Sequence, residues 1–380
     1  MLNEAAVRLL NWYQLNKRDL PWRAGNNPYY IWVSEIMLQQ TRVEAVKPYF
    51  QRFLTELPTV RDLAECPEEK LLKLWEGLGY YNRVRNMQKS AQIVVNDYGG
   101  KMPASYEQLL ALPGIGSYTA GAIASIAYGI AVPAVDGNVL RILSRINADP
   151  SDIAKQSVKK QAEQTLLSLM NGDETDAEVK AHPGELNQAW MDLGAGICLP
   201  GGEPACERCP LKELCRAHEK GQERAFPVKS KKLKRRLEDR TILLVQDSEK
   251  IALHKRPSKG LLAGLYEFPN LEGHLTEEEA LQYVEKMGLF PVQIRTLDPA
   301  KHIFSHVEWH MKGYLIRVAS FEGKLNDNYL LAEVKTVEEQ YAIPSAFSAY
   351  TRCLALQLGP ERARKNRRRY ETTDSSDSLL

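Results

Sequence analysis

The chain of 380 residues contains no long run of apolar side chains. A helix that crosses a bilayer needs about 20 consecutive apolar residues, so we expect no membrane partner. Residues 1–20 mix charged and apolar side chains and lack the apolar core and cleavage site of a secretory leader, which favours a cytoplasmic protein. The formal net charge is only +2, and a value so close to neutral is weak support for a polyanionic partner.

Cysteine is scarce as well, and its distribution is uneven. Four of the six cysteines crowd into residues 198–215 in the pattern C-x7-C-x2-C-x5-C, namely Cys198, Cys206, Cys209 and Cys215. A cytosolic compartment keeps thiols reduced, so the crowding favours a metal centre over disulfides. Four thiolates suit one iron–sulfur cluster or one zinc ion, and spacing alone does not separate the two. Cys66 and Cys353 stand apart and are predicted core residues.

The pattern of apolar residues divides the chain into segments. Residues 1–220 carry apolar side chains at three- and four-residue spacings with frequent proline or glycine breaks, which predicts an all-α domain. Residues 221–238 are highly charged and typical of a linker. In residues 239–358, two short apolar runs joined by a polar turn indicate a β-hairpin and an α+β domain. Residues 359–380 are basic and polar, and they are predicted to be disordered.

A glycine-rich turn lies between two helical segments of the first domain. Gly114 and Gly116 in the sequence LPGIG permit a positive φ and expose successive N–H groups beside the start of the next helix, which favours phosphate binding. LPGxG before a small-residue helix is typical of the helix-hairpin-helix element, which grips the DNA backbone without reading sequence. The alternative is a close-packed corner between two helices.

Two acidic residues are candidates for chemistry. Glu35 falls on a predicted helix whose apolar residues lie nearly all round, so its carboxyl group is expected to be partly buried and its pKa raised. A carboxylic acid that stays protonated near neutral pH is what general-acid catalysis requires. The alternative is a buried glutamate that its neighbours satisfy. Asp136 precedes another predicted helix, and as a lone residue it would be interpreted as a helix N-cap.

Five longer stretches carry a family resemblance. These are LPWR (20–23), SEIMLQQTRV (34–43), LWEGLGYYNRVRN (74–86), VDGNVLRIL (135–143) and LNQAWMDLGA (186–195). Together they closely resemble the MutY family, adenine DNA glycosylases that act opposite 8-oxoguanine. The resemblance implies an all-α helix-hairpin-helix glycosylase domain with an iron–sulfur cluster loop, followed by an α+β Nudix-like domain. It also implies a monomeric enzyme that hydrolyses the N-glycosidic bond of adenine mispaired with 8-oxoguanine or guanine in double-stranded DNA.

The resemblance assigns roles around the scissile bond. Glu35 would protonate the adenine leaving group, Asp136 would stabilise the oxocarbenium-like sugar or attack it, and Asn138 would position this machinery. Related enzymes that also act as lyases place a lysine two residues after the second hairpin glycine, where it forms a Schiff base with the sugar. This chain has Tyr118 there. The substitution implies a monofunctional, hydrolytic glycosylase in which Tyr118 positions the aspartate or the sugar.

Base extrusion needs a pocket for the flipped adenine and a wedge for the hole left behind. By the resemblance, Trp22, Arg23 and Gln188 line the adenine pocket, and Gln40 and Tyr80 wedge into the stack. Taken alone, Tyr80 would be interpreted as core packing. The four clustered cysteines would hold a 4Fe-4S cluster that supports DNA docking and takes no part in hydrolysis. One residue more than the family spacing separates Cys198 from Cys206, a difference expected to be absorbed by the glycine pair at 201–202.

The second domain resembles the 8-oxoguanine recognition domain of the same family, which is related to Nudix hydrolases. We expect a helix at 276–287 and strands near 303–318. The stretch AGLYEFPN (263–270) and the loop Phe304-Ser305-His306 carry the match, and Ser305 would contact the altered edge of the lesion. Taken alone, His306 would be a strand histidine bonded to the backbone. The aligned Nudix metal motif keeps one glutamate, Glu285, which implies a recognition module without pyrophosphatase activity.

Two other functions compete with this hypothesis. One is a glycosylase and lyase like endonuclease III, which acts on oxidised pyrimidines; Tyr118 and the extra domain argue against it. The other is a non-catalytic binder of damaged or branched DNA that uses the hairpin and cysteine cluster only for docking. Glu35 and Asp136 argue against such a binder.

Overall fold

The computed structural model describes residues 1–230, 234–321 and 329–356, so the predicted tail at 359–380 lies outside the described residues. The chain divides into two compact units. The first comprises Met1–Glu65 and Arg85–Lys231, and the second comprises Cys66–Val84 and Lys232–Leu380. Segment 66–84, which belongs to the all-α part of the sequence, therefore groups by its contacts with the second unit. Within the described ranges, no helix is long and apolar enough to cross a membrane.

The first unit is helical. Its α-helices are α1 (Leu2–Asn16), α2 (Pro28–Leu38), α3 (Val43–Glu56), α4 (Val60–Glu65), α7 (Tyr106–Leu110), α8 (Ser117–Tyr128), α9 (Gly137–Asn147), α10 (Gln156–Asn171), α11 (Ala177–Ala181), α12 (Pro183–Gly196) and α13 (Arg216–Glu219), together with most of α6 (Asn82–Asp97). Helix α12 packs against α1, α8 and α9, and α2 packs against α3 and α8. The fully buried Trp190 on α12 lies in the core that these contacts enclose.

Local sequence explains where the helices around the hairpin begin. The Asn27 side chain accepts hydrogen bonds from the next turn, and Pro28 supplies a fitting φ, so α2 begins there. Gly114 adopts φ +78°, and a Cβ at this position would lie 2.7 Å from Cβ of Asn86. The turn therefore requires glycine both for its backbone conformation and for its close approach to α6. Gly116 is the N-cap of α8, so the predicted hairpin is the element that starts this helix.

The second unit is built on a twisted sheet in the strand order β3-β2-β1-β6-β5, with β4 paired to β1 and β7 paired to β2. The strands are β1 (Arg236–Gln246), β2 (Lys250–Lys255), β3 (Tyr266–Glu267), β4 (Asn270–Glu272), β5 (Pro291–Ile303), β6 (Val307–Val318) and β7 (Tyr329–Glu333). Strands β1 and β6 run parallel, and the other pairs are antiparallel. The strands expected near 303–318 correspond to β6 and the end of β5, and the first three residues of β1 (236–238) lie inside the predicted linker.

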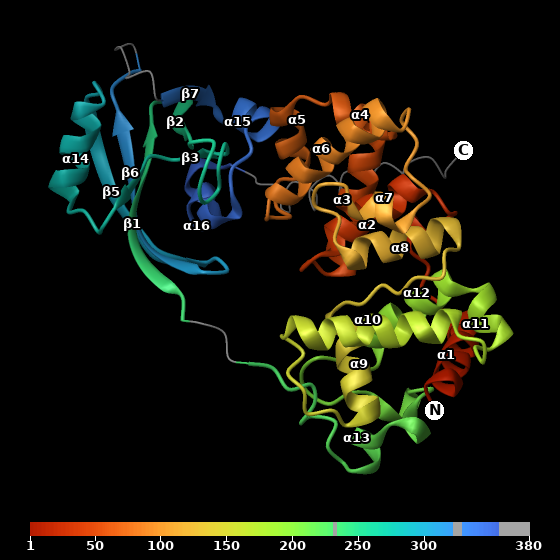
Figure 1. Ribbon diagram of the computed structural model, residues 1–380. Coiled ribbons are helices and arrows are strands. Elements are labelled where there is room, and N and C mark those ends of the chain that lie inside the picture. The colour runs from red at the N-terminus through yellow and green to blue at the C-terminus, as the bar shows by residue number, and fades with distance from the viewer. Residues whose placement is uncertain (231–233, 322–328, 357–380) are drawn as a thin grey trace, which may run out of the picture. The chain divides into compact units, whose positions relative to one another are not determined.

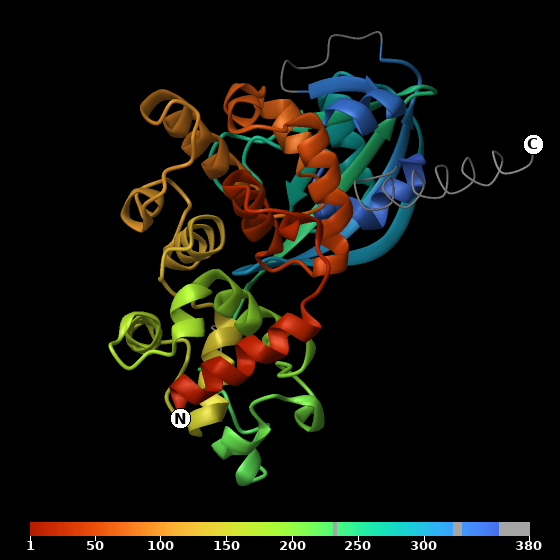
Figure 2. The ribbon, with the colours of Figure 1, turned by 90° about the vertical axis from the view of Figure 1, so that its right-hand side faces the viewer.

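Helices cover both faces of this sheet (Figures 1 and 2). Leu243 and Val245 on β1 pack with α14 (Glu277–Lys286), which is the helix expected at 276–287 and begins with a Thr276 capping box. Ile242 and Leu244 point to the opposite face, because side chains alternate along a strand. That face is covered by α15 (Val334–Gln340) and α16 (Ser348–Thr351). Cys66 is buried as predicted, but Cys353 is exposed, so the prediction that it is a core residue is wrong.

Candidate active site and metal centre

Glu35 and Tyr118 meet between two helices of the first unit. Glu35 is only 5% exposed on α2. Tyr118 on the first turn of α8 donates a hydrogen bond of 2.7 Å from its hydroxyl to Oε2 of Glu35. Burial, together with the negative charge of Asp136, raises the pKa of Glu35 to about 7, although the Tyr118 hydrogen bond and the Arg23 charge oppose the rise. Near neutral pH this carboxyl group is therefore divided between its protonated and ionised forms.

Asp136 is the N-cap of α9. Its Oδ1 accepts hydrogen bonds from the backbone amides of Asn138 and Val139 at 2.8 and 2.9 Å. Its Oδ2 accepts a bond of 2.7 Å from Nδ2 of Asn138. Burial raises the pKa of Asp136, and these donors oppose the rise. The capping alternative therefore describes this side chain correctly, and the same side chain lies close enough to Glu35 to influence its proton affinity.

Helix α9 also connects Asp136 to the cysteine loop. Asn138 Oδ1 accepts a hydrogen bond of 2.9 Å from Nη2 of the buried Arg141. Arg141 Nη2 also donates to the carbonyl of Gly194, and its Nε donates to the carbonyl of Cys198, each at 2.9 Å. A Cβ on Gly194 would lie 2.6 Å from Cβ of Asn138, so glycine is required where α12 crosses the start of α9. A continuous set of hydrogen bonds thus joins the candidate catalytic carboxylate to the first cysteine.

Arg23 and Gln188 line a cavity of about 580 Å³ in the first unit. Trp22 is buried and packs edge-on against Phe50, with ring centroids 5.4 Å apart. The structure thus brings two of the three predicted pocket residues to one cavity, whereas Trp22, Glu35 and Asp136 are not among the residues that line it.

A buried aspartate that no sequence motif indicated holds Arg23 in place. Asp192 on α12, with a side chain only 2% exposed, pairs with Nη1 of Arg23 at 2.8 Å and with Nε of Arg18 at 2.8 Å. Arg18 and Asp19 also line the cavity. An acidic residue among the apolar positions of LNQAWMDLGA was the available signal, but it does not name partners that are 169 and 174 residues away.

The two predicted wedge residues share an uncommon backbone conformation. Gln40 adopts φ +62° at the end of α2, and Tyr80 adopts φ +49°. Residues with a Cβ seldom occupy this left-handed region, and an aromatic side chain there is an outlier that the surrounding fold must maintain. The Tyr80 side chain is 51% exposed. An exposed ring does not fit the core packing that was the alternative for Tyr80, and its role as a wedge stays a prediction.

The loop Phe304-Ser305-His306 forms the tight turn between β5 and β6, closed by a 2.8 Å hydrogen bond from the amide of Phe304 to the carbonyl of Val307. Phe304 packs edge-on against Trp309, which leaves the side chains of Ser305 and His306 exposed. Within the second unit, the hydroxyls of Ser305 and Tyr80 are 3.2 Å apart and hydrogen-bonded. Glu285 is exposed on α14.

Two of the four clustered cysteines, Cys198 and Cys215, contact Arg145 near the end of α9. The charges of Cys198, Cys206 and Cys215 all act on Cys209, so the four thiols are close together. Burial is the main cause that raises the pKa of Cys209 to about 12 and that of Cys206 to about 11. Arg145 on α9 places Nη1 3.1 Å from Sγ of Cys198. Four soft sulfur donors beside a buried cation fit a metal centre of net negative charge.

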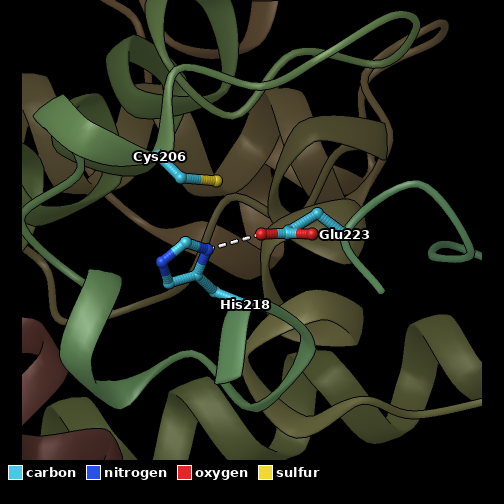
Figure 3. A group of neighbouring side chains, drawn as sticks. All are labelled: Cys206, His218 and Glu223. Atoms are coloured by element: carbon cyan, nitrogen blue, oxygen red, sulfur yellow. Dashed lines mark hydrogen bonds and ion pairs between the residues drawn. The ribbon is translucent and has the colours of Figure 1, made fainter. Parts of the chain in front are cut away.

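His218 and Glu223 extend this group beyond the predicted ligands (Figure 3). Ligand atoms of Cys206, His218 and Glu223 lie within 4.8 Å of one another. Nδ1 of His218 and Oε1 of Glu223 are 2.5 Å apart. The sequence pattern of cysteines gave no signal for either residue. The extra residue between Cys198 and Cys206 falls in a loop where Gly202 adopts φ +72°, with open space around it.

Two parts of the chain match known protein families. Residues 33–167 match the profile of the HhH-GPD superfamily base excision DNA repair protein, and residues 240–352 match the NUDIX domain. The chain therefore carries a helix-hairpin-helix domain of the base excision repair superfamily followed by a Nudix-like domain, and this part of the predicted fold class is confirmed.

Curated relatives narrow the assignment. The human adenine DNA glycosylase is 36% identical over 360 residues, which cover 79% of this chain and 64% of the human protein. The adenine DNA glycosylase of Buchnera aphidicola subsp. Baizongia pistaciae is 34% identical over 84% of this chain and 88% of its own length. The chain belongs to the adenine DNA glycosylase family. Among solved structures, a thermostable thymine-DNA glycosylase is 29% identical, with 57% of this chain and 95% of that chain covered and a TM-score of 0.48.

Proposed function

We propose that this protein hydrolyses the N-glycosidic bond of adenine mispaired with 8-oxoguanine or guanine in duplex DNA. The observation that carries the proposal is the buried Glu35, whose pKa of about 7 makes it a proton donor at neutral pH. Glu35 transfers its proton to the adenine as the bond from the base to C1′ of the sugar breaks. Water then adds to C1′ and returns a proton to the carboxylate, so the acid is regenerated.

Asp136 stabilises the positive charge that develops on the sugar as the glycosidic bond breaks. Its position at the start of α9, held by Asn138, fixes one carboxylate oxygen against the helix and the other against an amide nitrogen. A preorganised carboxylate stabilises an oxocarbenium-like transition state without reorganisation. The Asp136 carboxylate is also a candidate nucleophile toward the sugar. Tyr118 offers no amine for a Schiff base and instead orients the proton donor. The expected product is an abasic site in an intact strand.

DNA is proposed to be held and opened by elements of both units. The hairpin at Gly114 and Gly116 presents the start of α8 to a backbone phosphate. The cavity lined by Arg23 and Gln188 receives the extruded adenine, and the strained residues Gln40 and Tyr80 fill the vacated stack. The exposed Ser305 and His306 meet the 8-oxoguanine, and Phe304 anchors their loop. The enzyme is proposed to act as a monomer on double-stranded DNA.

The four cysteines are proposed to hold a 4Fe-4S cluster. When bound, the cluster supplies structural cross-linking of the loop at 198–215 and no group for the hydrolysis. Arg145 and Arg141 connect that loop to α9, so the order of the loop contributes to the position of Asp136.

A cleavage assay tests this function. Duplexes carrying adenine opposite 8-oxoguanine, adenine opposite guanine, or thymine glycol are incubated with the protein and then treated with alkali to reveal abasic sites. We expect adenine release from the first two, with strand breaks only after alkali. Activity on thymine glycol alone, or strand breaks without alkali, would contradict the proposal. Glu35→Gln should release no adenine and still bind the duplex, whereas Glu174→Gln at an exposed position should match the wild type.

A further inference from the structure

Segment 66–84 is joined to the rest of the second unit by a buried ion pair. Helix α5 (Glu68–Leu74) lies beside α15 (Figure 1). Lys73, with 12% of its side chain exposed, is 2.9 Å from Oε2 of Glu76, whose side chain is 3% exposed. Lys73 Nζ also donates to the carbonyls of Val337 and Tyr341 at 3.2 and 2.9 Å. Glu76 Oε1 accepts a bond of 2.9 Å from the amide of Ile343. Both side chains therefore bind the backbone at 337–343.

The same segment continues into the turn that carries Tyr80. Trp75, next to Glu76, donates from Nε1 to the carbonyl of Gly79 at 3.1 Å. Arg83 donates to the carbonyls of Leu78 and Gly79, and its guanidinium lies over the rings of Trp75 and Tyr80 at 5.4 and 5.6 Å. The contacts that hold residues 73–76 therefore also hold the turn at 77–81. Within this turn, the hydroxyl of Tyr80 is hydrogen-bonded to that of Ser305.

Stability alone does not account for the ion pair. A buried ion pair repays its desolvation cost poorly, and apolar residues of similar volume often serve as well or better. What the pair supplies is geometry, because its two side chains satisfy three backbone groups on another part of the same unit. A pair of this kind fixes the position of α5 relative to the end of α15 and the segment that follows it.

We propose that Lys73 and Glu76 are positioning residues that set discrimination between 8-oxoguanine and guanine opposite the target adenine. They hold the turn at 77–81 against the rest of the second unit, through the backbone at 337–343, so that Tyr80 remains beside Ser305. The proposal rests on the proposed function, in which Ser305 meets the 8-oxoguanine and Tyr80 enters the vacated stack. A displacement of about 1 Å at such a contact is enough to lower a rate on the order of a hundredfold.

The test uses the full-length chain with Lys73→Met and Glu76→Leu combined, which removes both charges of the pair together. Two quantities are measured: hydrogen exchange at the Ile343 amide, and single-turnover adenine release opposite 8-oxoguanine and opposite guanine. We expect Ile343 exchange to accelerate by about tenfold. We also expect release opposite 8-oxoguanine to fall by about tenfold or more relative to release opposite guanine. Lys255→Met removes the exposed pair with Glu69 elsewhere on α5 and should leave the ratio unchanged.

A double-mutant cycle with Ser305→Ala distinguishes positioning from a general loss of structure. If the ion pair acts through Ser305, its removal changes the ratio only where Ser305 is present. Tyr80→Phe, which removes one hydroxyl and leaves the buried pair in place, should reproduce the lost discrimination even if the double variant folds poorly. Faster Ile343 exchange with an unchanged ratio, or the same loss in the Ser305→Ala background, would overturn the inference. Failure of the wild type to release adenine would instead reject the proposed function.

Discussion

The hydroxyl of Tyr118 donates its hydrogen bond to Oε2 of Glu35 and not to Asp136. A hydrogen bond to a carboxylate favours the ionised form, so this contact lowers the pKa of Glu35 against the rise caused by burial. Tyr118→Phe should therefore raise that pKa above about 7. Adenine release, which needs the protonated acid, should then persist to higher pH than in the wild type. Single-turnover rates between pH 5 and 9 measure the shift, and a shift to lower pH would contradict the assigned direction.

Ionisation of Glu35 should lower the free energy of unfolding at alkaline pH. Its pKa rises from 4.5 to about 7 on folding, so the folded state binds the proton more tightly. The free energy of unfolding must then fall as pH rises through this window, by about 3 kcal/mol in total. Glu35→Gln should remove that loss and be more stable than the wild type at pH 8, with a smaller difference at pH 5. Urea unfolding at the two pH values checks this, with Glu174→Gln as the control.

Asp136 allows its structural and chemical roles to be separated. Asn is a good N-cap and keeps an oxygen for the amides of Asn138 and Val139, although its NH2 group loses the bond from Nδ2 of Asn138, so Asp136→Asn should unfold at a higher temperature than Asp136→Ala. Adenine release should nevertheless be lost, because the negative charge is gone. Asp136→Ala should lose activity and also about 1 kcal/mol of stability. If Asp136→Asn remained active, the carboxylate would have no role in the reaction.

Asp192 should influence Glu35 through the arginine that it neutralises. Asp192→Asn leaves the charge of Arg23 uncompensated, and that charge lowers the pKa of Glu35. The alkaline limit of adenine release should therefore move to lower pH. Loss of one partner from this buried cluster should also cost about 3 kcal/mol of unfolding free energy. Asp173→Asn at an exposed position is the matched control, and an unchanged pH limit would show that Arg23 does not act on the acid.

The cysteine cluster can be tested by its metal content. Cys209→Ser should lower the bound iron and the visible charge-transfer absorbance, because one thiolate ligand is lost. Cys353→Ser removes an exposed thiol outside the cluster and should change neither quantity. Stoichiometric zinc in a colourless wild-type protein would reject the iron–sulfur assignment.

Local sequence features predicted what depends on neighbouring residues. The start of α2 follows from Asn27 and Pro28, and the burial of Glu35 follows from the apolar residues around that helix. The pairing of Asp192 with Arg23 was beyond such reasoning, because it depends on α12 packing beside the start of the chain. The grouping of segment 66–84 with the second unit likewise depends on Glu76 binding the distant amide of Ile343. Positive φ at Gln40 and Tyr80 has no local signature, since neither residue type favours it.

The helix cap at Asp136 has a consequence for surveys of related sequences. A lineage that abandoned the reaction would still gain from an aspartate at this position, because the start of α9 needs an acceptor for its first amides. Glu35 caps nothing, and its burial opposes folding above neutral pH. Selection for stability alone would remove it. In a chain of doubtful activity, a glutamate at position 35 is therefore the more informative mark of a working enzyme.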